Sequence, residues 1–180
     1  MRSIKVYSSL LTLALGMGLV GCSTAPKAPD VAANVRGALT QAGLRDISAT
    51  QDRDKGVVTL TGHVTSDNDK LRAESVARSV AGQQVVANQI EVLPPGVEAE
   101  AKKVNAALDK GISANMDAAL IQYNLRDVKY NVKNHVVTLT GDVDTQELRS
   151  KAETVASAVP NVQQVVNELQ VRVQKATSTR

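Results

Sequence analysis

The chain has 180 residues and a formal net charge of +3, because 21 Lys and Arg residues stand against 18 Asp and Glu residues. Two of the basic residues, Arg2 and Lys5, precede the first apolar segment, and without them 19 basic residues remain. A chain so close to neutrality, with no Trp and no Phe, lacks the clustered positive charge and the stacking aromatic residues of nucleic-acid-binding proteins. We therefore expect no nucleic-acid partner.

The first 21 residues have the three parts of a secretory signal peptide. A short basic start precedes the uncharged stretch Val6–Val20, which is shorter than the roughly 20 residues of a bilayer-spanning helix. The sequence Leu19-Val20-Gly21-Cys22 then resembles the bacterial lipobox. This resemblance implies cleavage before Cys22, a diacylglyceryl group on its thiol and an N-acyl chain. We predict residues 1–21 as a lipoprotein signal peptide, Cys22 as the lipid attachment site, and no cofactor beyond these acyl chains.

Residues 22–29 follow as the lipidated cysteine and a flexible tether rich in Ser, Thr, Ala and Pro. Cys22 is the only cysteine, so no disulfide can form within the chain. Ser23 stands where Asp would indicate retention in the inner membrane, and this resembles the outer-membrane sorting pattern of Gram-negative bacteria. We therefore predict an envelope protein anchored to the outer membrane by its lipid and facing the periplasm.

The rest of the chain contains an internal repeat. Residues 57–92 align with residues 136–171 without a gap, and sixteen of the 36 pairs are identical. Upstream, Leu44-Arg45-Asp46-Ile47 corresponds to Leu125-Arg126-Asp127-Val128, with two extra residues in the first copy before the aligned block. Each copy contains its own strands and helices, so the repeat predicts two copies of one small domain.

The first copy changes its hydrophobic period in a fixed order. Apolar residues four apart predict a helix that Asp30 caps and Gly43 ends. Alternation then predicts two strands joined by a turn, followed by a helix with a narrow apolar face and a last alternating strand. The predicted elements are a helix at 30–42, strands at 47–49 and 58–64, a helix at 73–80 and a strand at 86–92.

The second copy repeats this order, so the predicted fold class is α+β: two tandem αββαβ domains, each with two helices on one face of a three-stranded mixed sheet. A domain of about 60 residues buries only about 60% of the surface that its unfolded chain exposes. We therefore expect the two copies to pack against each other. Pro94-Pro95-Gly96 ends the first copy, and a helix-rich connector runs on through Gly111. The predicted segments are the first domain at 30–93, a turn and connector at 94–110, the second domain at 111–173 and a flexible tail at 174–180.

Two pairs of residues keep their place in both copies without being apolar. Gly62 and Gly141 interrupt the second strand, where glycine marks a bulge or a close approach by another backbone. We expect the second helix of each copy to pack over them. Asn88 and Asn167 lie in otherwise apolar last strands, and we expect each amide to close the strand end against a neighbouring backbone.

The succession of V-T-L-T-G on the second strand, a helix of small apolar residues and a final V-x-N-x-[IL]-x-V resembles the BON domain. The resemblance covers essentially the whole mature chain, twice, and implies a dual-BON outer-membrane lipoprotein. It further implies a non-enzymatic role: association with anionic phospholipid, support of outer-membrane integrity and, in relatives, a stress-induced periplasmic function. The residues that carry it are Val57–Gly62, Val86, Asn88, Ile90 and Val92, and then Val136–Gly141, Val165, Asn167, Leu169 and Val171.

The family's membrane contact lies on the first helix of the second domain, which corresponds here to about residues 112–123. Ile112, Met116 and Leu120 match sheet-facing positions of the first copy, and we favour that place for them. Tyr123 and the flanking charges are freer to meet a membrane. The candidate membrane contacts are Lys110, Met116, Tyr123 and Arg126.

No pattern in the sequence predicts catalysis. His63 and His135 occupy different positions in their copies, and we expect both to be exposed strand-end residues and not metal ligands. Four acidic residues between 52 and 69 fail the spacing of an EF-hand loop, and turn formation and helix capping explain them. We expect neither an enzyme nor a bound metal.

The sequence leaves two classes of function open. The first is binding of anionic phospholipid or an envelope partner in support of outer-membrane integrity. The alternative is a periplasmic chaperone-like or protein-interaction module, in which open sheet faces or strand edges receive a polypeptide, or a structural adaptor of an envelope assembly.

Overall fold

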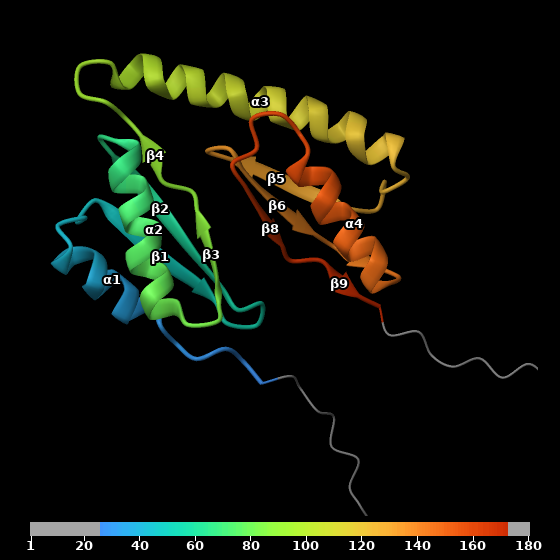
Figure 1. Ribbon diagram of the computed structural model, residues 1–180, viewed down its shortest axis with the longest axis horizontal. Helices are drawn as coiled ribbons and strands as arrows, with labels where there is room; N and C mark the ends of the chain where they lie inside the picture. Colours follow the sequence, from blue (N-terminus) through green and yellow to red (C-terminus); the bar gives the residue numbers. More distant parts are fainter. Residues whose placement is uncertain (1–25, 173–180) are drawn as a thin grey trace, which may run out of the picture.

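The computed structural model describes residues 26–172 (Figure 1). The predicted signal peptide, Cys22 and the tail at 174–180 lie outside the described residues. Among the described residues, no helix combines the length and the apolarity that a bilayer span requires. The elements are α1 (Ala32–Gln41), β1 (Ile47–Asp52), β2 (Val57–Val64), α2 (Asp67–Ala81), β3 (Val85–Asn88), β4 (Glu91–Val92), α3 (Glu98–Gln122), β5 (Lys129–Lys133), β6 (Val136–Thr140), β7 (Asp142–Val143), α4 (Gln146–Ser157), β8 (Gln164–Asn167) and β9 (Gln170–Val171).

Each copy forms the predicted mixed sheet under two helices. In the first copy, β1 is antiparallel to β2, and β3 and β4 are both parallel to β2. In the second copy, β5 is antiparallel to β6, β8 is parallel to β6, and β9 is parallel to β7. The last strand of each copy is therefore broken in two. Each domain has its own apolar core between its sheet and its helices.

The repeated asparagines bridge the break in the last strand to the helix above it. The Asn88 side-chain amide donates to the Lys70 carbonyl at 3.2 Å and to Glu74 Oε2 at 3.0 Å. The Asn167 amide donates to the Arg149 carbonyl at 3.1 Å and to Glu153 Oε2 at 2.9 Å. Both amides thus meet a neighbouring backbone, as predicted, and that backbone belongs to a helix.

The repeated glycines have a different cause from the one expected. Gly62 has φ +119°, and a Cβ there would overlap the carbonyl oxygen of Asp46. Gly141 has φ +113°, and a Cβ would lie 3.5 Å from the Asp127 carbonyl oxygen. The expectation that the second helix packs over these glycines is wrong, because the close neighbour is the backbone that leads into the first strand.

The cap of α1 also differs from the prediction, because Asp30 does not cap it. Gln51 Oε1 on β1 accepts from the backbone N–H of Val31 at 3.0 Å and of Ala32 at 3.3 Å. A helix N-terminus leaves its first N–H groups without helical partners, and here a side chain from the sheet receives two of them. The start of α1 is therefore fixed by a contact between residues far apart in the sequence.

The predicted connector is part of one continuous helix. The 25 residues of α3 run through Gly111 without a break, and Figure 1 shows the helix passing from the first domain across the second. Asp109, in its middle, accepts the backbone N–H of Asn134 and of His135 at 2.9 Å each. This helix therefore ties the β5–β6 turn to the connector.

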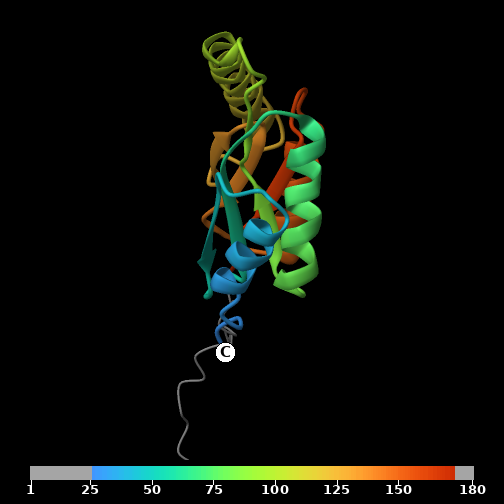
Figure 2. The same cartoon turned by 90° about the vertical axis from the view of Figure 1, so that its left-hand side faces the viewer.

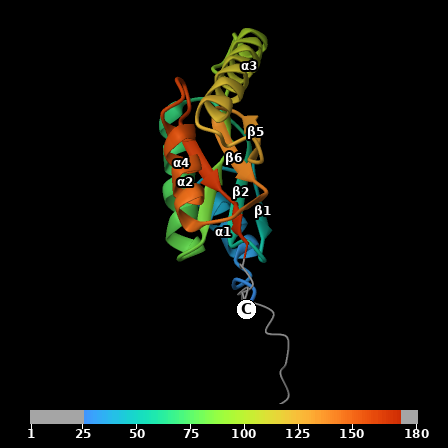
Figure 3. The same cartoon turned by 90° about the vertical axis from the view of Figure 1, so that its right-hand side faces the viewer.

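The two domains meet through their last strands, β3 and β8 (Figure 1). Four buried residues form a separate apolar cluster at this junction, and they are two equivalent pairs from the repeat: Val57 with Val136, and Ala87 with Val166. Lys55 Nζ adds an ion pair with Glu168 at 2.5 Å. Figures 2 and 3 show α2 and α4 on the same side of the sheets. The expectation that the copies pack against each other is confirmed.

Candidate functional site

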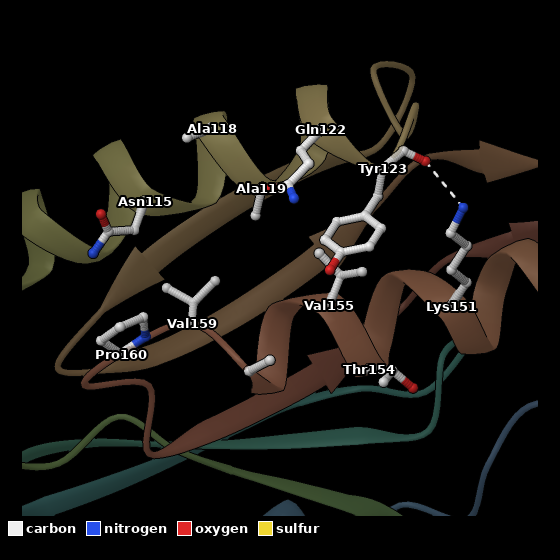
Figure 4. A pocket seen from close by; sticks show the side chains of 11 residues that line it. Asn115, Ala118, Ala119, Gln122, Tyr123, Lys151, Thr154, Val155, Val159 and Pro160 are labelled. Carbon is white, nitrogen blue, oxygen red and sulfur yellow. Dashed lines mark hydrogen bonds between the residues drawn. The ribbon is translucent and has the colours of Figure 1, made fainter.

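The second domain carries a largely apolar groove of about 590 Å³ between α3 and α4 (Figure 4). Its walls are side chains from the last three turns of α3 and the last two turns of α4, and Pro160 closes one end. The lining residues are Ala118, Ala119, Tyr123, Val155, Ala158, Val159 and Pro160, with Asn115, Gln122, Lys151 and Thr154.

A basic residue on α4 joins the two helices that form the groove, because it bonds the C-terminal end of α3. Lys151 Nζ donates to the backbone carbonyl of Tyr123 at 3.1 Å (Figure 4). In the first domain, Arg72 Nη2 makes the same bond to the Ala42 carbonyl at 2.8 Å. A cation at this place satisfies an unpaired carbonyl and interacts favourably with the negative end of the helix dipole. The contact is therefore a shared structural device of both domains.

Tyr123 distinguishes the second domain, because the equivalent residue in the first domain is Ala42. The Lys151 ammonium lies 5.8 Å from the centroid of the Tyr123 ring, within reach of a cation–π interaction. The Tyr123 side chain is nevertheless 44% exposed, and the neighbouring Ile121 is 56% exposed. An exposed aromatic residue thus stands beside a cation at the mouth of an apolar groove, whereas Ile121, two residues earlier on α3, points to a different side of the helix.

The structure separates the four predicted membrane contacts. Met116 is fully buried in the core with Ile112 and Leu120, so its assignment as a membrane contact is wrong, and the sheet-facing position is confirmed. Tyr123 lines the groove, and the exposed Arg126 follows it by three residues. Lys110 is exposed but lies thirteen residues before Tyr123, about 20 Å along the helix axis. The four residues do not form one surface.

Three groove residues were missed from the sequence: Lys151 and Val155 on α4, and Val159 just after it. Val155 and Val159 look like ordinary core positions because they repeat Val76 and Val80. The change from Ala42 to Tyr123 was the available signal, since it replaces a methyl group by a ring at a helix end in one copy only.

The two histidines differ in environment. His63 is exposed, as predicted. The prediction is wrong for His135, which is partly buried in a polar cavity of about 180 Å³ between the domains, where its Nε2 atom has no hydrogen-bond partner. Burial lowers the pKa of His135 below its usual value, and the charge of Lys70 lowers it further against the opposing effect of Asp109. Its φ of +66° is uncommon for a residue with a side chain.

The acidic residues between 52 and 69 act locally. Asp52 Oδ1 accepts the backbone N–H of Asp54 at 3.0 Å and of Lys55 at 3.1 Å. Ser66 caps α2 by accepting the N–H of Asp69 at 3.2 Å. The predicted turn formation is confirmed at Asp52, whereas the cap of α2 is Ser66, and Asp67 and Asp69 lie in the first turn of the helix.

Comparison with known proteins places this arrangement in a family. The family model of the BON domain matches residues 27–94 and again residues 101–173. The chain belongs to the BON family. The predicted resemblance and the α+β fold class of two BON domains are therefore confirmed, and the second match begins within α3.

Two relatives are similar in sequence over most of the BON tandem. Osmotically-inducible protein Y of Escherichia coli strain K12 is 30% identical over 146 residues, which cover 79% of this chain and 71% of that protein. An uncharacterized protein from the gshII 5′ region of Anaplasma centrale is 30% identical over 121 residues, which cover 66% of this chain and 78% of that protein. This BON-domain protein is thus a relative of an osmotically inducible protein.

Solved structures of CdsD, a structural protein of the type III secretion system of Chlamydia trachomatis, are similar at a lower level. The C-terminal domain of CdsD aligns with 76% of this chain at a TM-score of 0.33 and 10% identity. A second CdsD structure aligns with 79% at a TM-score of 0.32 and 11% identity. The chain spans 62% of each of those structures.

Proposed function

We propose that this chain is a non-enzymatic lipoprotein of the bacterial envelope, anchored to the outer membrane through Cys22, whose second BON domain contacts anionic phospholipid at the mouth of the α3–α4 groove. Membership of the BON family and the relationship to osmotically-inducible protein Y support an envelope role in barrier integrity. The observation that carries the proposal is the exposure of Tyr123 beside Lys151 at the mouth of an apolar groove.

The chemistry of this surface suits the headgroup region of a bilayer. A tyrosine has an apolar ring and a polar hydroxyl, so it is stable where hydrocarbon gives way to headgroups. Lys151 and Arg126 lie where they can meet lipid phosphate, and each basic residue near an anionic surface contributes about 1 kcal/mol.

The groove itself gives the contact a second component. Its walls are mainly Ala and Val side chains with the Tyr123 ring, and a volume of about 590 Å³ lies within the usual range of ligand sites. A segment of a lipid acyl chain can lie in such a groove while the phosphate stays near Lys151. The groove would thus add lipid-specific burial to the charge attraction.

A liposome-binding titration tests the proposal. The Cys22→Ser chain removes the acyl anchor, because the anchor alone would carry any domain to a membrane. We expect it to bind vesicles that contain phosphatidylglycerol more tightly than vesicles of phosphatidylcholine alone, and to bind more weakly as salt rises, because screening shortens the range of the attraction. Equal binding to both vesicles, or no binding, would contradict the proposal.

One groove variant and one matched control locate the contact. Tyr123→Ala should weaken vesicle binding about tenfold, which corresponds to about 1.4 kcal/mol. Leu71→Ser is the control, because Leu71 is a 64% exposed apolar residue on α2 of the first domain. Its affinity should equal that of the unsubstituted protein.

A further inference from the structure

In the described residues, the β3 and β8 edges face each other at the domain junction, and one outward carbonyl of the β1 edge is bonded by a side chain. The β3 edge receives the Gln164 side chain, which donates to the Val86 carbonyl at 2.7 Å and accepts the Asn88 N–H at 2.9 Å. The β8 edge faces β3 across the same junction. At the β1 edge, Arg36 Nη1 on α1 donates to the Ala49 carbonyl at 2.8 Å.

The fourth edge, β5, is open. The turn between β5 and β6 has two residues, Asn134 and His135, both with positive φ, and Lys133 pairs with Val136 at its base. Such a closing pair is hydrogen-bonded, so the backbone groups of Tyr130 and Val132 point away from β6. Within residues 26–172, no hydrogen bond from the rest of the chain reaches these outward groups.

Comparison of the repeats shows why this edge is open. Counting from the Leu-Arg-Asp match before each first strand, Asp117 stands at the position of Arg36, and Tyr130 stands at the position of Ala49. The carboxylate cannot donate to an outward carbonyl, and Asp117 Oδ1 instead accepts from the Tyr130 hydroxyl at 2.6 Å. The second domain therefore lacks the arginine that bonds the outward carbonyl of the first strand in the first domain.

The charges of β5 select what can pair with this edge. Lys129, Asn131 and Lys133 are exposed and alternate with the half-buried Tyr130 and Val132. Lysines on an edge strand oppose pairing between two copies of the same edge, because like charges placed opposite each other are destabilising. Opposite charges at the same places are stabilising. Two copies of the β5 edge would therefore repel each other, whereas an acidic strand has the complementary charge.

We propose that β5 is a docking edge for an extended, acidic segment of another polypeptide, which joins the second sheet as an additional strand. The segment would exchange backbone hydrogen bonds with Tyr130 and Val132, place acidic side chains opposite Lys129 and Lys133, and place apolar side chains beside Tyr130 and Val132. Main-chain bonds would give affinity, and the alternating side chains would give specificity. This edge uses none of the residues of the lipid-binding groove.

Two synthetic heptapeptides test the docking edge. The first, acetyl-Ser-Glu-Val-Thr-Val-Glu-Ser-amide, is symmetric enough to bind in either direction, and the second carries Lys in place of both Glu residues. We expect the Cys22→Ser chain to bind the Glu peptide at least about tenfold more tightly, with the largest NMR shifts at the amides of Tyr130 and Val132. Equal affinity for both peptides, no binding, or shifts centred elsewhere would overturn the proposal.

Two variants separate docking from unspecific charge attraction. Val132→Pro removes an outward N–H without removing a bond to β6 and should lower affinity for the Glu peptide about tenfold, whereas Val132→Thr keeps the N–H and should bind normally. Lys129 and Lys133 are both exposed, so the double variant Lys129→Glu with Lys133→Glu should fold normally. It should bind the Lys peptide more tightly than the Glu peptide. Unchanged binding by Val132→Pro in a protein of native circular dichroism, or an unchanged preference in the double variant, would refute strand pairing at this edge.

Discussion

The backbone N–H of Asn88 in the first domain donates to Gln164 Oε1 in the second, at 2.9 Å. The amide group of Gln164 acts here as a short piece of strand, since its Nε2 also donates to the Val86 carbonyl at 2.7 Å. The matching residue of the first domain is Val85, which cannot return these bonds. The two domains are therefore joined by an asymmetric contact within a nearly symmetric interface.

The first prediction concerns this contact. Gln164→Val makes the second domain match the first but leaves the Val86 carbonyl and the Asn88 N–H without a partner. Each buried group left unpaired costs about 1–3 kcal/mol, so we expect the free energy of unfolding in urea, followed by circular dichroism, to fall by at least about 2 kcal/mol. Gln146→Val, at an exposed position on α4, is the control and should change it by less than about 0.5 kcal/mol. Equal losses in both variants would show that the contact does not join the domains.

The second prediction compares the two repeated glycines. Both have a φ that is strained for any residue with a Cβ, so Gly141→Ala should lower the free energy of unfolding by about 1–3 kcal/mol. Gly62→Ala should cost more, because its Cβ would also overlap the carbonyl oxygen of Asp46. Thermal unfolding of the two variants measures the difference. Gly141→Ala proving the more damaging change would contradict this explanation.

The fold was accessible from the sequence because its signals are local and occur twice. The period changes and the V-T-L-T-G strand predict the helices and a mixed sheet in each domain, but not the breaks that divide the last strands into β3 and β4 and into β8 and β9. The missed details depend on residues far apart in the sequence. Gln51 on β1 caps α1, and the Asp46 carbonyl oxygen leaves no room for a Cβ at Gly62. No local pattern marks either contact, since each exists only after the sheet has formed.

The third prediction concerns pH and His135. Its pKa is lowered by burial and by Lys70, so the folded state favours neutral histidine, while the unfolded chain takes up a proton near pH 6.5. Below about pH 6.5 the unfolded state binds more protons, and stability falls as pH falls toward the folded pKa. Urea unfolding at pH 7.5 and pH 5.0 should show this loss.

His135→Asn should reduce that loss, because Asn does not titrate and tolerates positive φ. His63→Asn, at an exposed position, is the matched control and should keep the full loss. An identical pH dependence in both variants would exclude His135 as its source.

The fourth prediction concerns the tie between α3 and the β5 strand. The Tyr130 hydroxyl donates its single proton to Asp117 Oδ1 at 2.6 Å, with the Ser113 carbonyl oxygen 2.9 Å away as a second acceptor within reach. Burial and the Asp117 carboxylate raise the pKa of Tyr130 to about 12. Tyr130→Phe should lower the free energy of unfolding at pH 7 by about 1–3 kcal/mol, as expected for a hydrogen bond to a charged group, and Tyr123→Phe should change it by less than about 0.5 kcal/mol. A loss in Tyr130→Phe no larger than in Tyr123→Phe would contradict the role of these bonds.

The candidate site was only partly accessible from the sequence. Tyr123 was found because the family resemblance indicated the first helix of the second domain. Met116 was wrongly included because it lies on the same helix, although its match to a sheet-facing position of the first copy already indicated burial. Lys151 could not be found by position in the chain, since it reaches Tyr123 across the space between two helices. The groove forms only where α3 and α4 lie side by side, so the sequence of neither helix predicts it.

The most direct test of the central claim is a measurement of where the protein meets lipid. Backbone NMR signals of the Cys22→Ser chain would be recorded on bicelles that contain phosphatidylglycerol and a headgroup spin label. We predict that paramagnetic broadening is strongest at Tyr123 and Lys151 and absent from Leu71 on the first domain. Broadening centred on the first domain, or spread evenly over both, would contradict lipid recognition by the α3–α4 groove.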